Sequence, residues 1–248
     1  MGVLTNLGRT ATRAVGGLTL DAANGVLSAA DTVRAAVTGQ ELGPATLRVH
    51  VVILSDEQGR PLCSPGAVQP ALWTADQVLR EQADIRLRVA RIQVIDEPAP
   101  PRALDPRANK RLLLDDVLGR TEFYRRHQAP SGIGSPDPGS WVVGTPITVV
   151  VVREIAGRTT GCSLGMSADW VIVQASLFDR TNSGTYDETV LVHELGHALN
   201  LPHLRDRRNL MYPESSPPDG IRGTHLRAWQ EALLHANRHV VPGVAGPG

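Results

Sequence analysis

The sequence is poor in cysteine and aromatic residues, carries no net charge and contains no long apolar run. With only Cys63 and Cys162, at most one internal disulfide can form, which excludes a disulfide-dense scaffold. A formal net charge of zero gives no reason to expect nucleic acid or an anionic membrane as a partner. Because no run of about 18 apolar residues occurs, the sequence predicts no membrane-spanning helix.

The first residues also lack a compact apolar stretch behind a basic start, so no secretory signal is recognised. We therefore expect a cytoplasmic protein or one exported by a non-classical route. A composition of 42% apolar and 20% charged residues is ordinary for a soluble globular protein. The length of 248 residues fits one domain with an appendage or two small domains.

An apolar stripe with helical steps of three and four runs through the first 40 residues. The favoured interpretation is a helix packed on the main domain. A removable prosegment or a partner-docking arm is the alternative. Gly43-Pro44 then interrupts the chain, which suggests an N-terminal helical segment over 1–44 and a catalytic domain over 45–248. The stripe consists of Val15, Leu18, Ala22, Val26, Ala30, Val33 and Val37.

Strand and helix patterns alternate after residue 45. A strand, a helix and a second strand over 47–54, 70–84 and 85–95 predict a parallel pair with a crossover. Continuous β-branched residues predict a buried strand over 147–153, and a further strand is expected over 170–174. The remaining expectations are a proline-rich loop over 96–108, a helix over 109–127 and a Gly/Pro-rich loop over 128–145.

The motif His193-Glu-Leu-Gly-His197 carries the chemistry. Thr185-Tyr-Asp-Glu188 is a capping-box pattern and predicts the start of its helix. Residues four apart on a helix share one face, so the two imidazoles stack and suit a tetrahedral zinc ion. Glu194 would then lie beside the attacking water as a general base. The residues expected to face the core are Leu191, Leu195, Ala198 and Leu199.

His203 is the predicted third ligand. A continuous helix would point it away from His197, because six residues turn the chain by about 600°. Pro202 prevents that continuation and pushes Leu201 out of the helical region. Asn200 is, after glycine, among the residues that best tolerate a left-handed conformation. We therefore expect a positive φ at Asn200, a sharp reversal and three histidines converging on one zinc ion.

This stretch resembles the metzincin signature HExxHxxGxxH followed by a Met-turn, and the resemblance covers residues 185–213. Met211, within Leu-Met-Tyr-Pro, lies eight residues after His203, as in the matrixin branch. Asn200 stands where the family has glycine, a departure that its tolerance of the left-handed region allows. Tyr212 directly follows Met211 and is not assigned as a ligand.

The resemblance implies a zinc-dependent endopeptidase with an α+β fold. A twisted mixed sheet and the active-site helix would form the upper part, and the Met-turn and a C-terminal helix the lower part. Residues 225–239 fit that helix, with Leu226, Trp229 and Leu233 as its apolar stripe. Met211 would form an apolar floor beneath the three imidazoles. One catalytic Zn²⁺ is implied; no calcium or structural-zinc pattern is evident, and a calcium requirement is left open.

The expected partner is a peptide or protein substrate that lies extended against a sheet edge. By position that edge is segment 160–165, and the primed-side pocket would be walled by 213–215 and the loop 217–220. Two other functions stay open: a hydrolase of a non-peptide amide, and a non-catalytic zinc-binding interaction protein of the same fold. The candidate cleft residues are Gly161, Cys162, Ser163, Leu164, Pro213 and Ser215.

Cys63 lies in a run, Arg60-Pro-Leu-Cys-Ser-Pro65, that faintly resembles the matrixin cysteine switch. The residue order differs, however, and Cys63 follows the first predicted strand instead of lying in a prosegment. A disulfide to Cys162, or two free thiols, is therefore the expectation.

Overall fold

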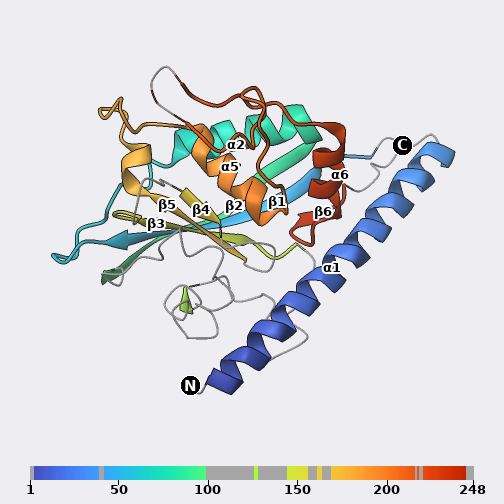
Figure 1. Cartoon of the computed structure of the whole chain (residues 1–248), viewed down its shortest axis with the longest axis horizontal. Coiled ribbons are helices and arrows are strands. Elements are labelled where there is room, and N and C mark those ends of the chain that lie inside the picture. The colour runs from blue at the N-terminus through green and yellow to red at the C-terminus, as the bar shows by residue number, and fades with distance from the viewer. Residues whose placement is uncertain are drawn as a thin grey trace.

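The computed structural model describes residues 3–38, 42–98, 126–127, 144–155, 161–163, 169–215, 217 and 220–243. These residues form one sheet with helices against it and a long N-terminal helix at one side (Figure 1). The helices are α1 (Val3–Thr38), α2 (Gln69–Ala83), the short 3₁₀ helix η3 (Ala175–Phe178), α5 (Thr189–Ala198) and α6 (Ala228–Ala236). The strands are β1 (Ala45–Ser55), β2 (Ile85–Pro98), β3 (Ile147–Val152), β4 (Gly161–Ser163), β5 (Trp170–Gln174) and β6 (Val240–Val241).

The sheet runs in the order β2-β1-β3-β5-β4, and β6 pairs with the start of β1. The pairs β1/β2, β1/β3 and β3/β5 are parallel, so the predicted crossover through α2 is confirmed. β4 is antiparallel to β5 and ends the order, which confirms that this segment is an edge. The strand β2 reaches Pro98, so residues 96–98 of the expected loop belong to this strand instead. The other residues expected to form loops or a helix between 99 and 143 lie outside the described part, except for 126–127.

The two faces of the sheet bury alternate residues of the central strands. In β3, Val149 and Val151 belong to the large core, whereas Val150 and Val152 belong to a smaller cluster on the opposite face. Successive side chains of a strand point to opposite faces, and here both faces are apolar. The continuous β-branched run therefore marks a strand buried on both sides, as predicted. Helices α2 and α5 cover the face with the large core (Figure 1).

Helix α1 contacts the rest of the molecule through α6 and the turn after it, but not with its apolar stripe. Val15, Leu18 and Val26 are 66%, 53% and 70% exposed, so the stripe is not the packing face. The contacting face carries small and polar residues instead, among them the buried Gly17 and Asn24. Of the other stripe members, Ala22 and Ala30 are exposed, and the side chains of Val33 and Val37 lie outside the described ones.

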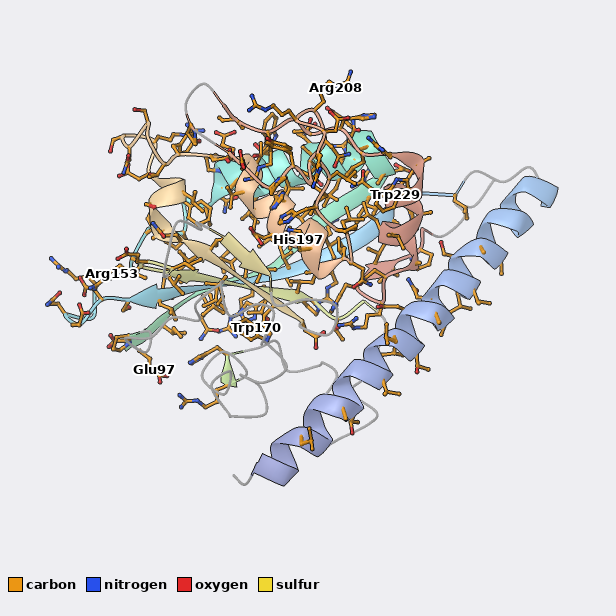
Figure 2. The ribbon with its side chains drawn as sticks, in the orientation of Figure 1. Glu97, Arg153, Trp170, His197, Arg208 and Trp229 are labelled. Atoms are coloured by element: carbon orange, nitrogen blue, oxygen red, sulfur yellow. The ribbon has the colours of Figure 1, made fainter. Side chains whose placement is uncertain are left out.

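Helix α6 is shorter than the predicted span of 225–239, and its buried face differs from the expected one. Of the predicted stripe, Leu226 is buried, but Trp229 and Leu233 are 42% and 37% exposed, whereas Gln230 and Leu234 are fully buried. Relative to the predicted orientation, the helix turns Gln230 inward, where its side-chain amide is hydrogen-bonded to Asn209 in the turn that carries Met211. A polar side chain with a buried partner therefore outweighs the apolar periodicity, which was the wrong guide here. Figure 2 shows Trp229 on the outer part of this helix.

Among the described residues, no helix is both long and apolar enough to cross a membrane.

Candidate metal centre

Helix α5 carries His193, Glu194 and His197, and Asp187 provides its start. The Asp187 Oδ1 atom accepts hydrogen bonds from the backbone N and the hydroxyl of Thr189, at 2.8 and 2.6 Å. The predicted capping box is therefore wrong: Thr185 donates to the carbonyl of Ser176 instead, and Glu188 binds Tyr186 and Thr74. Asp187 satisfies a free N–H at the start of the helix in their place. The four residues expected to face the core, Leu191, Leu195, Ala198 and Leu199, are all buried.

The helix ends in a reversal centred on Asn200, whose φ of 73° confirms the predicted left-handed conformation. The backbone N–H of Asn200 donates to the carbonyl of His197 at 3.0 Å, and the backbone N–H of Leu201 donates to the carbonyl of Gly196 at 2.9 Å. This pair of bonds is the Schellman arrangement, in which the left-handed position is usually glycine. The chain then turns back and places His203 near the helix that it has just left.

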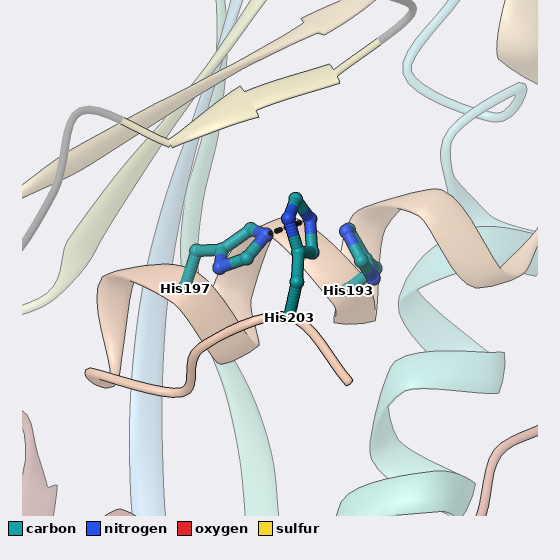
Figure 3. Close-up of side chains that lie close together, drawn as sticks. All are labelled: His193, His197 and His203. Carbon is teal, nitrogen blue, oxygen red and sulfur yellow. Dashed lines mark hydrogen bonds between the residues drawn. The ribbon is translucent and has the colours of Figure 1, made fainter. Parts of the chain in front are cut away.

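The rings of His193, His197 and His203 converge, as Figure 3 shows. Each offers one nitrogen, and the three atoms lie within 4.8 Å of one another. The Nδ1 atoms of His193 and His197 lie 2.7 and 2.8 Å from the carbonyls of Leu210 and Leu201. A carbonyl only accepts, so both rings carry hydrogen on Nδ1 and present the Nε2 lone pair. The three histidines are thus positioned to bind one ion, and this donor set fits zinc.

The electrostatic environment keeps these imidazoles neutral. Burial lowers the pKa of His193 to about 2 and that of His197 to about 4, and it also lowers the pKa of His203. The positive charge of Arg222 acts in the same direction on all three pKa values. A neutral imidazole has a free lone pair, so the ligands are ready for a cation at neutral pH.

Glu194 is buried beside the histidines and lies against the edge strand β4. A Cβ atom placed on Gly161 would be 2.6 Å from Oε1 of Glu194 and 2.7 Å from its Cγ. Only a residue without a side chain leaves this space for the glutamate. The edge segment was expected from position alone, and the contact of Gly161 with Glu194 was not predicted.

Met211 is fully buried against α5. A Cβ atom on Gly196 would lie 2.7 Å from its sulfur and 3.4 Å from its Cε. The Met211 backbone N donates to Oδ1 of Asn209, which is also bonded to Gln230 of α6. The turn that carries Met211 is therefore held against both the active-site helix and the C-terminal helix.

Arg222 is a residue that the sequence did not single out. It is buried, and its Nη2 lies 3.9 Å from Oδ2 of Asp187, which also accepts the hydroxyl of Ser215 at 2.5 Å. Within the described part of the chain, its Nε and Nη1 have no hydrogen-bond partner. Burial lowers the pKa of Arg222, while the carboxylates of Asp187 and Glu194 act against this. The guanidinium thus adds a positive charge next to the histidines and Glu194.

The remaining candidate residues are less informative. Gly161, Cys162 and Ser163 form β4, but the side chains of Cys162 and Ser163 lie outside the described ones. Pro213 is exposed, and Leu164 lies outside the described residues. Cys63 is a free thiol, so the disulfide to Cys162 is not formed. Burial raises the pKa of Cys63 to about 11, which keeps it a protonated thiol against the core.

Part of the chain that includes this site is similar to known peptidases. Residues 137–224 match the model of the matrixin family of peptidases. Among solved structures, metalloproteinase-II from Bacteroides fragilis is similar with a TM-score of 0.45 and 17% identity, covering 78% of this chain and 54% of that one. Archaemetzincin from Methanopyrus kandleri is similar with a TM-score of 0.43 and 17% identity, covering 76% and 93%. No curated protein matches the chain.

The chain thus spans about half the length of the Bacteroides protein, 54% of it. The matrixin match includes α5, the reversal at Asn200 and the turn of Met211. Together with the three converging histidines, it fits a metzincin-like zinc metallopeptidase.

Proposed function

We propose that the chain is a zinc-dependent endopeptidase in which His193, His197 and His203 hold the ion and Glu194 is the general base. The observation that carries the proposal is the convergence of three neutral imidazoles beside a buried glutamate, which lies on the same helix as two of them. Zinc, when bound, supplies Lewis-acid activation of a water molecule and of the substrate carbonyl. A peptidase family implies a peptide or protein as the substrate.

Glu194 moves the proton in this proposal. Its carboxylate accepts a proton from the attacking water as the new C–O bond forms, and it donates that proton to the leaving amine as the C–N bond breaks. Gly161 leaves room for the glutamate because it contributes no side chain to that contact. Met211 supports α5 from the other side as the floor of the site.

The substrate backbone would pair with β4. This strand is antiparallel to β5, and no other described strand lies on its outer side. An exposed strand edge binds an extended peptide through main-chain hydrogen bonds, which suits cleavage within a chain. Pro213 and Ser215, which follow Met211, would line the primed side.

The test is Glu194→Gln, which keeps the shape of the side chain but removes the base. Peptide hydrolysis should fall by roughly 10²- to 10⁴-fold, the usual contribution of a general base. Zinc content and melting temperature should barely change, because Glu194 is no ligand. Glu231→Gln on the exposed side of α6 is the matched control and should leave turnover intact. Near-normal turnover by Glu194→Gln would show that another group moves the proton.

The same assay separates the alternatives. A hydrolase of non-peptide amides would bind zinc but leave a diverse peptide library uncut. A non-catalytic binding protein would bind zinc and turn over neither class of amide. Internal cleavage of library peptides that stops with a chelator supports the endopeptidase, and a mass-spectrometric map of the products gives the cleavage position.

A further inference from the structure

Asp21 joins the N-terminal helix to the reversal that carries the third histidine. Its Oδ2 accepts a hydrogen bond from the Asn200 side-chain amide at 3.1 Å. Its Oδ1 accepts another from the backbone N of Arg238 at 2.8 Å. These two residues lie 179 and 217 positions away in the sequence, so α1 bonds directly to two distant parts of the domain.

Asn200 has a particular need for such a bond. It occupies the left-handed position of the Schellman turn, where any side chain costs more than glycine does. Its Oδ1 is buried and has no hydrogen-bond partner within the described part of the chain. The side chain is therefore held through its Nδ2, which donates to Asp21. The hydrogen bond that Asn200 donates to Asp21 thus stabilises the left-handed conformation from outside the turn.

Asp21 is itself held in place by contacts that do not involve Asn200. The Asn24 amide, one helical turn later, lies 2.8 and 3.0 Å from the carbonyls of Asn237 and Val240. Gly25 approaches α6 so closely that a Cβ atom there would be 3.2 Å from the Cβ of Ala236. The buried Arg238 pairs with Asp21 on one side and with Asp169 on the other. The position of the carboxylate is therefore set by the helix junction.

We propose that α1 is a permanent part of the metal centre and that Asp21 is a positioning residue. It holds Asn200 in the left-handed conformation and so keeps His203, three residues later, directed at the ion. The proposal rests on the proposed function for the identity of the ligands, but it concerns zinc affinity and not hydrolysis. It also argues against a removable prosegment, because removal of α1 would take Asp21 away from the reversal and leave the buried Arg238 with one charged partner fewer.

The experiment is a double-mutant cycle with Asp21→Asn and Asn200→Gly, read as zinc affinity in competition with a chelator. The backbone N–H of Arg238 and the side chain of Asn200 donate to different oxygens of the Asp21 carboxylate, and asparagine offers only one oxygen. Asp21→Asn should therefore weaken zinc binding by about tenfold, the lower end for groups that orient ligands. Asn200→Gly should bind zinc like the wild type, because glycine adopts the left-handed conformation without help. In the Asn200→Gly background, Asp21→Asn should then have no further effect on affinity.

Asn200→Ala is the second variant, since it leaves the bonds between Asp21 and Arg238 intact. It should also weaken zinc binding about tenfold. Val26→Ala is the control on the exposed face of the same helix, where the side chain is 70% exposed. It should leave zinc affinity within about twofold of the wild type.

Two results would overturn the proposal: wild-type zinc affinity in Asn200→Ala, or an equal loss from Asp21→Asn in both backgrounds. Failure of the proposed function looks different. In that case the affinities would follow the predicted order while no peptide is cleaved.

Discussion

Gly161 and Glu194 are packed so closely that the edge strand and the active-site helix leave no room for a methyl group between them. A Cβ atom on Gly161 would lie 2.6, 2.7 and 2.9 Å from Oε1, Cγ and Cδ of the glutamate. Real Cβ atoms essentially never come so near to another heavy atom. The strand expected to bind substrate therefore also sets the position of the proposed base.

Gly161→Ala should displace the Glu194 carboxylate and lower kcat by about 100-fold, near the lower end of what a general base contributes. Zinc affinity should stay within about twofold, because the atoms that the new methyl group meets first belong to Glu194 and not to a ligand. The measurement is kcat and KM on one peptide, together with zinc affinity. Gly184→Ala is a matched control, since a Cβ there would meet nothing closer than 3.7 Å. Unchanged kcat in Gly161→Ala would mean that Glu194 has room to move without losing its function.

Gly196, which packs against Met211, gives a comparable prediction for the floor of the site. Gly196→Ala would place a methyl group 2.7 Å from the Met211 sulfur, so the turn must shift away from α5. Overpacking of this kind costs about 1–3 kcal/mol, and thermal unfolding of the metal-free chain should show it. The double variant with Met211→Ala should lose less stability than the sum of the two single losses, because Met211→Ala removes the atoms that clash. Additive losses in the double variant would contradict the contact.

The strands and the metal centre could be predicted because local patterns determine them. The β-branched run that forms β3 shows no alternation between apolar and charged residues, and this pattern is typical of a strand buried on both faces. The third histidine could be predicted for a similar reason: Pro202 ends the helix and Asn200 permits the reversal, and both effects act within a few residues.

The packing faces of α1 and α6 could not be read from apolar periodicity. In both helices the buried side is chosen by polar residues whose partners are remote in sequence, such as Asn24 with Asn237 and Gln230 with Asn209. A hydrogen bond across 213 positions leaves no local trace. The same holds for Asp21, whose sequence context is an unremarkable helix. Its link to Asn200 is visible only in the folded structure, where α1 lies beside the reversal.

The stability of the fold should depend on pH through the protonation of Asp169. Burial alone would raise the pKa of this carboxyl, but the hydrogen bonds and charges of His239 and Arg238 outweigh that effect and hold it at about 2. Because the folded value lies below the ordinary 3.8, the ionised carboxylate stabilises the fold above about pH 3.8. That contribution is lost as the pH falls from there towards 2.

The measurement is the melting temperature of wild type and Asp169→Asn between pH 5 and pH 2, at about half-unit steps. The wild type should lose stability more steeply across this window, because the variant has no group at this position left to protonate. The variant should be less stable at pH 5, since Arg238 loses a charged partner. Parallel curves for the two proteins would contradict the assignment.

Zinc itself should stabilise the fold, and the size of the effect should separate the roles of the ligands. A ligand at about 100 times its Kd adds about 2.7 kcal/mol, which for a chain of this size is about 5–10 °C in melting temperature. His203 is the most exposed of the three histidines, on the loop after Asn200. His203→Ala should therefore leave the metal-free chain nearly as stable as the wild type and abolish the rise with zinc. His193 is buried and bonded to the Leu210 carbonyl, so His193→Ala should lower the metal-free melting temperature as well. Differential scanning fluorimetry with and without zinc would measure both values for each variant, and a full zinc-dependent rise in His203→Ala would remove that histidine from the site.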